Sequence, residues 1–405
     1  MRYLRACMLY LLVLLTLIAG CAPDAKGRAD ALPAGEIVPQ LSPDHRHLLS
    51  LHKDLWNLAR FPENDLACTY PVEEKHLVSG FAWAPRSDAF AYHTEHEASG
   101  GSGGVYLAKV DGSSERVADL EPPKLGSRQM LWSPCGRYLF WDDPFTIYDR
   151  ETGELLVRKD IDDHVRSPLF SADSSKLALT LLRDDGLENL WVMDLDSGSV
   201  RQVTDEGEGD YPYRWMDDTT LMVRIGAVGT GGGHVYGLAA VDLETGSRVL
   251  VDVDEPSSDG LDGPWLRRIH VVKSFSPDGD CLIGESRTGA GTESRIYLLE
   301  LETGRREVIL EGETPSEGYG LGQVLRTQAG QVVLSVRKES YDDVDHDSQG
   351  GYQILEYSTE SGCLLLAESK TKTHLLGIVD GQLYYLILNE TGSEWSTSVC
   401  DLQTR

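Results

Sequence analysis

The chain has 405 residues, of which 41% are hydrophobic and 25% are charged, a composition typical of a folded protein. Acidic residues outnumber basic ones by 65 to 37, which gives a formal net charge of −28 at pH 7. Such a surface repels nucleic acid and anionic lipid headgroups, so we expect no nucleic-acid partner and no membrane attachment through charge. It also disfavours a polyanionic ligand, unless a local basic pocket binds it.

The first twenty residues have the pattern of a secretory signal peptide. Arg2 and Arg5 give a positive start, and an apolar run then extends to Gly20. This run is short for a membrane-spanning helix, which needs roughly 20 apolar residues. The junction Ile18-Ala19-Gly20-Cys21 resembles the lipobox of bacterial lipoproteins. The resemblance implies cleavage between Gly20 and Cys21 and acylation (palmitate) of the Cys21 sulfur. An ordinary signal peptide and an uncleaved anchor helix are the alternatives.

A lipid on Cys21 would place the protein in the cell envelope, on the extracytoplasmic side of the cell membrane or outer membrane. Two acyl chains are enough for stable attachment. Residues 21–41 are rich in Ala, Pro, Gly and Asp, which predicts a flexible tether.

Residues 42–61 are predicted to form a short amphipathic helix. Ser42 can cap its start, and leucines recur at helical spacing from Leu48 to Leu58. The mixed charges of its polar face favour packing on the following domain, and contact with a membrane or partner is the alternative.

The remaining residues, 66–405, repeat two phrases in alternation. The first is an aromatic residue, a tight turn and an apolar strand, as in Phe275-Ser276-Pro277-Asp278-Gly279 before Cys281-Leu282-Ile283. The second is an apolar strand with an acidic hairpin turn that ends in Gly, as in Ile296-Tyr297 to Thr303-Gly304. Both phrases occur seven times, and four short strands in a unit of about 40–45 residues are typical of a propeller blade. The predicted fold is therefore all-β, a single β-propeller of seven four-stranded blades.

Copies of the first phrase also begin at Trp83, Trp132, Phe170 and Trp215. Together the phrases resemble the WD-repeat-like propellers of the TolB family and of the dipeptidyl peptidases, over residues 66–405. The resemblance implies the fold and leaves the function open, because the family includes binding scaffolds, accessory domains and enzymes. The peptidases carry a separate α/β-hydrolase domain after the propeller, for which we expect no room before Arg405.

The seventh unit stops before a fourth strand. Because an open sheet edge exposes unpaired backbone groups, we expect the N-terminal side, at about residues 66–78, to supply the outer strand of the last blade. Cys68 and Cys400 would then lie on neighbouring strands, where a disulfide could form.

One acidic loop is a candidate calcium site. Asp343, Asp345 and Asp347 alternate in residues 341–350, and carboxylate oxygens are the ligands that Ca²⁺ prefers. The glycine and glutamate of a standard calcium loop are absent, so a solvated acidic hairpin is the alternative.

No catalytic motif is identified. Residues 100–104 match the G-x-S-x-G pattern but lack the strand-to-helix turn that this nucleophile requires. The sequence therefore predicts a non-catalytic, membrane-anchored module that binds a protein or peptide through its loops. The alternatives are a propeller enzyme, a hydrolase or lyase of the lactonase or cyclase type with a metal site at the central channel, and a structural component of the envelope.

Overall fold

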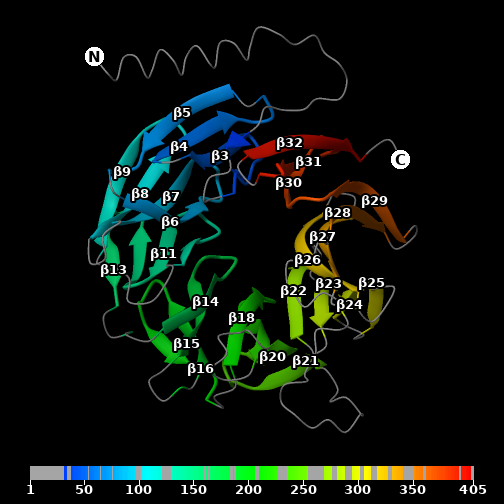
Figure 1. Cartoon of the computed structure of the whole chain (residues 1–405). Helices are drawn as coiled ribbons and strands as arrows, with labels where there is room; N and C mark the ends of the chain where they lie inside the picture. Colours follow the sequence, from blue (N-terminus) through cyan, green and yellow to red (C-terminus); the bar gives the residue numbers. More distant parts are fainter. Residues whose placement is uncertain are drawn as a thin grey trace, which may run out of the picture.

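In the computed structural model of the protein, 32 strands form eight four-stranded antiparallel sheets around one axis (Figure 1). The structure describes residues 32–33 and 38–402, except residues 53, 64, 75, 97–101, 121–128, 159–160, 162–163, 183–185, 187, 206–208, 227–234, 254–268, 276–280, 288–293, 302–304, 312–316, 327–330, 341–350, 359–361 and 392–393. In this described part there is no helix long and apolar enough to cross a membrane.

Each sheet is one blade, and in blades 1 to 7 the strands follow the sequence from the innermost strand to the outermost, whereas the outermost strand of blade 8 is β1. The strands of blades 1 to 4 are β2 (Gln40–Leu41), β3 (His47–His52), β4 (Leu55–Arg60), β5 (Asp65–Pro71); β6 (His76–Trp83), β7 (Ala89–His96), β8 (Gly103–Lys109), β9 (Ser114–Leu120); β10 (Met130–Trp132), β11 (Tyr138–Asp142), β12 (Phe145–Asp149), β13 (Leu155–Val157); and β14 (His164–Phe170), β15 (Lys176–Leu182), β16 (Glu188–Asp194), β17 (Val200–Gln202).

The strands of blades 5 to 8 are β18 (Gly209–Trp215), β19 (Thr220–Gly226), β20 (Val235–Asp242), β21 (Arg248–Val253); β22 (Ile269–Phe275), β23 (Cys281–Arg287), β24 (Ser294–Glu300), β25 (Arg306–Glu311); β26 (Glu317–Arg326), β27 (Val332–Ser340), β28 (Tyr352–Ser358), β29 (Gly362–Ser369); and β30 (Thr373–Val379), β31 (Gln382–Leu388), β32 (Glu394–Asp401) with β1 (Leu32–Pro33).

The all-β propeller is confirmed, but it has eight blades rather than seven. The additional one is blade 1, which replaces the predicted helix over residues 42–61. The hairpin of β3 and β4 pairs Leu49 with Leu58 and Leu51 with Trp56. These four side chains face one apolar cluster with the alternation of a strand, and the helical spacing of the leucines was coincidental.

The ring closes with a strand from the N-terminal side, as expected, but from a different segment. Residues 66–78 do not pair with β32, because β5 completes blade 1 and β6 begins blade 2. Instead, Leu32 and Pro33 of β1 pair with Trp395 and Glu394 of β32.

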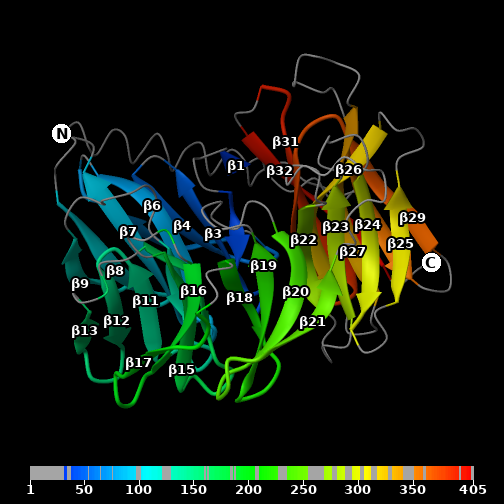
Figure 2. The ribbon, with the colours of Figure 1, turned by 90° about the horizontal axis from the view of Figure 1, so that it is seen from below.

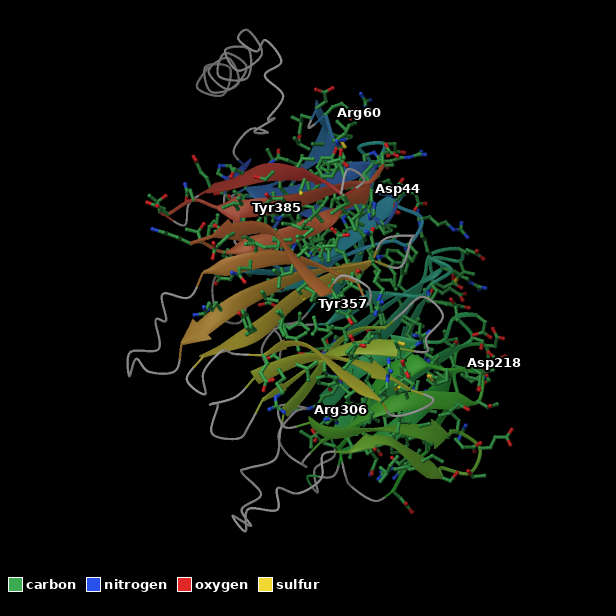
Figure 3. The ribbon with its side chains drawn as sticks, turned by 90° about the vertical axis from the view of Figure 1, so that its right-hand side faces the viewer. Asp44, Arg60, Asp218, Arg306, Tyr357 and Tyr385 are labelled. Carbon is green, nitrogen blue, oxygen red and sulfur yellow. The ribbon has the colours of Figure 1, made fainter. Side chains whose placement is uncertain are left out.

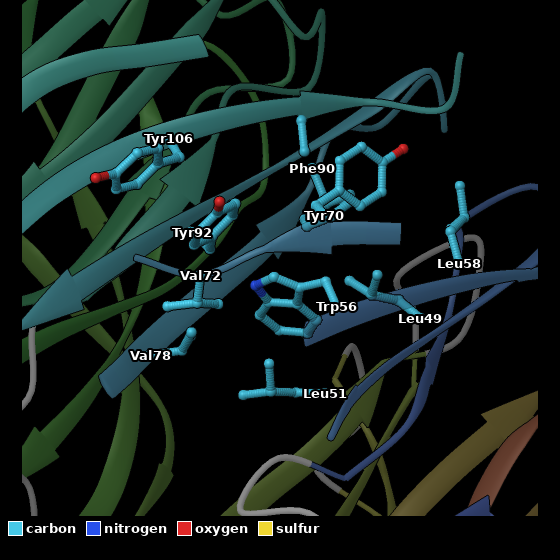
Figure 4. Packing of buried hydrophobic residues seen from close by; sticks show 11 residues of the cluster. Leu49, Leu51, Trp56, Leu58, Tyr70, Val72, Val78, Phe90, Tyr92 and Tyr106 are labelled. Atoms are coloured by element: carbon cyan, nitrogen blue, oxygen red, sulfur yellow. The ribbon is translucent and has the colours of Figure 1, made fainter. Parts of the chain in front are cut away.

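Apolar clusters between successive blades form the core. One cluster lies at each of the eight junctions, including the closing junction, where Leu48 and Phe61 of blade 1 meet Leu376 and Tyr384 of blade 8. At the junction of blades 1 and 2, Trp56 lies at the centre of the cluster (Figure 4). Because both faces of a blade are covered, its inner strands are apolar on both sides.

The tight turns that join the innermost to the second strand lie together on one face, which we call the turn face. Asp44 and Asp218, in the turns of blades 1 and 5, lie on the same side of the molecule (Figure 3). The innermost strands begin at the opposite face, here called the start face, and the strands of the blades run between these two faces (Figure 2). Innermost strands of neighbouring blades contact one another, as β14 contacts β18 and β22 contacts β26. The φ of Gly136, 75°, explains why the turn phrase contains a glycine at this position. The Gly136 N–H donates to the Ser133 carbonyl oxygen, and the Ser133 hydroxyl accepts from the Tyr138 N–H at 2.9 Å.

Candidate functional site

The innermost strands share an irregularity near the start face. Six of them in the described part of the chain carry a β-bulge at an equivalent place: β6, β14, β18, β22, β26 and β30. A bulge redirects side chains and is common beside functional sites. The polar groups at these bulges are therefore the first places to look for chemistry.

A buried acid positions one arginine at the bulge of blade 4. Glu188 begins β16 and is completely buried, and its Oε1 lies 3.2 Å from Nε of Arg166 in β14. The hydroxyl of Tyr211, in β18 of the next blade, donates to the other carboxylate oxygen. About a third of the Arg166 side chain remains exposed, at 32%. The buried carboxylate thus holds an arginine whose other nitrogens can reach solvent or a ligand.

A second arginine lies beside the same bulge without an acidic partner. Nη2 of Arg224, in β19, donates to the Ser167 hydroxyl at 3.4 Å, and its guanidinium lies 5.6 Å from the ring centre of Tyr213. Its Nε is buried without a hydrogen bond, and no described carboxylate forms an ion pair with it. Burial lowers the pKa of Arg224, and burial raises the pKa of Tyr213 to about 12. Because this guanidinium is partly buried and its Nε is shielded from water, pairing with an anion would stabilise it.

A buried ion pair within blade 5 is joined to blade 4 by two threonine hydroxyls. Asp210 in β18 is completely buried and accepts from Nη2 of Arg248 at 2.5 Å and from the Thr204 hydroxyl at 2.7 Å. The Thr180 hydroxyl in β15 donates to the Asp210 carbonyl oxygen. Since these partners belong to two blades, the network fixes the blade junction on which the two arginines are placed.

A separate polar pair lies across the ring, on blades 7 and 8 (Figure 1). Gln323, at the bulge of β26, binds the backbone of Leu375 in β30 twice, at 2.7 Å through Oε1 and at 3.1 Å through Nε2. His374 lies beside it, with 3.4 Å between the two Nε2 atoms. Burial, with a smaller effect of Lys372, lowers the pKa of His374 to about 4, so this imidazole is neutral at pH 7.

A groove of about 550 Å³ at the outer rim is the third feature of note. Tyr138, Leu155 and Leu156 of blade 3 line it together with Leu195 of blade 4. Its Arg137 is already paired with Asp149, at 2.6 Å. The arginine of this groove therefore already has an acidic partner, in contrast to Arg224.

The lipidation and calcium residues singled out in the sequence cannot be placed relative to this site. Gly20 and Cys21, and the acidic residues Asp343, Asp345 and Asp347, lie outside the described residues. In the part of the chain that is described, no group of three or more His, Cys, Asp and Glu side chains is arranged to hold a metal ion.

The two cysteines predicted to be neighbours are not brought together. Cys68 lies in β5, where its sulfur is 2.9 Å from the Tyr70 hydroxyl, and Cys400 lies in β32 of another blade. Neither forms a disulfide in the structure. The expected pairing depended on residues 66–78 joining β32, and that strand assignment was wrong.

Sequence reasoning missed Arg166, Glu188 and Arg224. One signal was present: Arg224 interrupts the apolar run from Leu221 to Ile225, and a charged residue inside a buried strand needs an explanation. Arg166 and Glu188 are 22 positions apart (188 minus 166), and only the packing of strands brings them into contact.

Comparison with known proteins supports the fold. No protein-family model matches the sequence, and no curated protein is significantly similar to it. Among solved structures, an oligogalacturonate lyase in complex with manganese is 11% identical, with a TM-score of 0.51 over 94% of this chain and 98% of that one. The oligogalacturonate lyase of Vibrio parahaemolyticus is 12% identical, with the same TM-score, over 94% and 99%. Dipeptidyl peptidase 4 of Porphyromonas gingivalis is 11% identical, with a TM-score of 0.58, over 88% of this chain and 56% of that one.

The resemblance to dipeptidyl-peptidase propellers is thus confirmed for the fold. The prediction of a non-catalytic binding or scaffold module is contradicted, because two solved propellers that match over nearly their whole length are lyases. At these identities the likeness establishes the architecture, and the chain is an eight-bladed member of the β-propeller fold.

Proposed function

We propose that the protein is an enzyme that binds a carboxylate-bearing carbohydrate near the axis of the propeller and cleaves it, as a lyase. The observation that carries the proposal is Arg224, a partly buried guanidinium beside the innermost strand β14, with a hydroxyl and an aromatic neighbour but no described acid. A substrate carboxylate would supply the missing charge. The oligogalacturonate lyases that share the whole-chain architecture act on a substrate of this class.

The net charge of −28 makes such a local site necessary. A negatively charged surface repels an acidic oligosaccharide, so binding needs cations at short range, where screening is weak. Arg166 and Arg224 meet this need, since both reach the bulge of β14.

The chemistry of elimination fits this arrangement. In an elimination, the carbon next to the carboxylate loses its proton to a base, and negative charge spreads onto the carboxylate oxygens. The electron pair then forms a double bond to the neighbouring ring carbon as that carbon's bond to the glycosidic oxygen breaks, and the leaving oxygen takes up a proton. A guanidinium already placed at the carboxylate oxygens stabilises the negative charge without reorganisation. Arg224 would bind the carboxylate, while Glu188 and Tyr211 would position Arg166 for a second contact. The proposal assigns no step to a metal ion.

The test uses the purified protein with oligogalacturonates and with neutral oligosaccharides of equal length. Elimination produces an unsaturated uronide that absorbs ultraviolet light, whereas hydrolysis produces reducing ends without that absorbance. We expect Arg224→Ala to lower kcat/KM by about 10- to 100-fold, since a hydrogen-bonded charge contact contributes roughly 1.5–3 kcal/mol. Arg305→Ala is the control, because Arg305 is mostly exposed and pairs with Glu300 at the surface.

A stability measurement separates a functional from a structural role. If Arg224 serves a ligand, Arg224→Met should leave the free energy of unfolding unchanged or raise it, because a partly buried charge without a described acidic partner is removed. Cleavage of no acidic oligosaccharide, or equal loss of activity in the Arg305 control, would refute the proposed function.

We also propose that Cys21 carries the lipid and that the enzyme works on the extracytoplasmic side of a membrane. The support is the apolar run that ends in Ala19-Gly20-Cys21. Mass spectrometry of the N-terminal peptide should find acyl chains on Cys21, and Cys21→Ser should release the protein from membranes. An unmodified Cys21 in membrane fractions would contradict this proposal.

A further inference from the structure

The groove at the outer rim is lined by apolar side chains that continue into the core. Ile147 is only 4% exposed and belongs to the apolar cluster between blades 3 and 4, and Tyr138 and Leu195 pack against the same cluster. Leu155 and Leu156, in the outermost strand β13, also line the groove and are 42% and 38% exposed. Figure 1 shows β13 at the rim of the ring. An apolar group bound in the groove would therefore remove leucine surface from water.

Contacts between two blades hold the groove in shape. Leu195 and Asp196, in the hairpin after β16 of blade 4, line it together with the strands of blade 3. Arg158, directly after β13, donates from Nη1 to the Gly198 carbonyl oxygen of that hairpin at 2.6 Å. Leu156 approaches the same glycine, because its Cδ2 lies 3.9 Å from the position that a Cβ on Gly198 would take. Since these contacts already exist, a ligand can bind without first ordering the two blades, which lowers the entropic cost of binding.

The charges around the groove are mainly acidic. Among the described residues that line it, only Arg137 is basic, and this arginine already pairs with Asp149 at 2.6 Å and with Glu151 at 3.6 Å. Glu154 and Asp196 also line the groove, and both are exposed. Neither of these two carboxylates forms an ion pair with a basic residue in the described part of the chain. They are therefore available to an incoming cation.

The leucine surface and the two carboxylates together determine what the groove can bind. Leucine side chains favour an apolar group, whereas the carboxylates of Glu154 and Asp196 favour positive charge beside it. The volume of about 550 Å³ is within the range of ligand sites, about 300–1,000 Å³. A second copy of the chain, with its net charge of −28, would be repelled, and so would an acidic oligosaccharide. A peptide segment with an apolar side chain between lysines or arginines has both of the required properties.

We propose that the rim groove is a docking site for a basic segment of a partner protein. An apolar side chain of that segment contacts Leu155, Leu156 and Leu195, and its flanking lysines or arginines pair with Glu154 and Asp196. The groove lies at the outermost strand of blade 3, whereas the proposed carboxylate site lies beside the innermost strand of blade 4. The inference is therefore independent of the proposed enzymatic function, and substitutions in the groove should leave cleavage of oligogalacturonates unchanged.

Fluorescence anisotropy with three labelled peptides tests the groove in the full-length protein. The probe is fluorescein-labelled Lys-Leu-Lys-Leu-Lys, while Lys-Ser-Lys-Ser-Lys keeps the charge without the apolar groups and Glu-Leu-Glu-Leu-Glu reverses the charge. We expect the Lys-Leu peptide to bind about tenfold more tightly than the Lys-Ser peptide, and its affinity to fall as salt screens the exposed charge pairs. Equal affinity of these two peptides would overturn the proposal, because charge alone would explain the binding. Binding of the Glu-Leu peptide as tight as that of the Lys-Leu peptide would also overturn it.

Matched substitutions locate the binding site on the surface. Leu155→Ser should weaken binding of the Lys-Leu peptide about 5- to 10-fold, and Glu154→Gln combined with Asp196→Asn should weaken it about 3- to 10-fold. Val249→Ser and Glu244→Gln are the controls, because both side chains are exposed at the equivalent hairpin of blade 5. Equal effects at the two hairpins would place the binding outside the groove and overturn the proposal.

Two measurements on the unmodified chain keep the inference testable if a groove variant folds poorly. Hydrogen exchange should become slower in β13 when the Lys-Leu peptide is added, and unchanged exchange in β13 at saturating peptide would refute the docking site. Sedimentation should find no association of the chain with itself that the Lys-Leu peptide displaces. Such an association would assign the groove to a second copy and overturn the basic partner.

Discussion

Trp56 offers a direct test that residues 40–71 are a blade of the ring. Its side chain is completely buried, and its ring meets the rings of Phe81 and Phe90 edge-to-face at 5.2 and 5.6 Å. Both phenylalanines belong to blade 2, so Trp56 joins the two blades (Figure 4). Replacement by Ala therefore removes a contact between blades as well as a buried side chain.

The expected loss follows from the size of the deleted group. Truncating a buried aromatic residue to Ala lowers the free energy of unfolding by about 3–5 kcal/mol, and this includes about 0.5–1.5 kcal/mol for each edge-to-face ring pair. Trp56→Phe keeps one ring and should lose less. Leu66→Ala in the outer strand of the same blade is the control, because Leu66 is 51% exposed and should change stability by only about 0.5 kcal/mol.

Urea unfolding followed by circular dichroism measures all three variants, with equal m-values as the check that the same surface unfolds. If Trp56→Ala and Leu66→Ala lose similar amounts, below about 1 kcal/mol, residues 40–71 are not packed into the ring and the eight-blade assignment is refuted.

Two further predictions concern a turn and a histidine. Gly246 and Gly153 occupy equivalent hairpin turns at φ values of 71° and 75°. A Cβ on Gly246 would strike the Val203 carbonyl of the preceding blade, whereas one on Gly153 meets nothing within 4 Å. Both Ala variants should lower the free energy of unfolding by about 1–2 kcal/mol, because alanine is strained at a positive φ. Urea unfolding should show a further loss of about 1–3 kcal/mol for Gly246→Ala, and equal losses in the two variants would contradict the contact with Val203. Burial lowers the pKa of His374 from 6.5 to about 4, so the unfolded chain binds a proton that the folded chain does not. Stability should therefore fall as pH decreases from about 6.5 to about 4, and His374→Gln should reduce this slope; an unchanged slope would contradict it.

The fold could be predicted to the extent that its units repeat. The turn phrase and the hairpin phrase identified blades 2 to 8, because a tight turn needs particular residues whatever surrounds it. The same phrase is present in blade 1 as Leu41-Ser42-Pro43-Asp44-His45, with His45 in place of Gly at a φ of 59°. Because histidine replaces glycine there, and because the leucines have helical spacing, this copy of the turn phrase was not recognised in the sequence.

The sequence by itself determined the strand-and-turn character of the chain, the repeat, and the acidity that requires any anion site to be local. Only the tertiary structure decided how many blades close the ring, which residues close it, and which charges meet. Closure depends on the angle that each packed junction contributes, and Arg166, Glu188 and Arg224 come together through contacts between strands and blades. Such contacts depend on how the strands and blades pack, so they cannot be predicted from the spacing of residues along the chain.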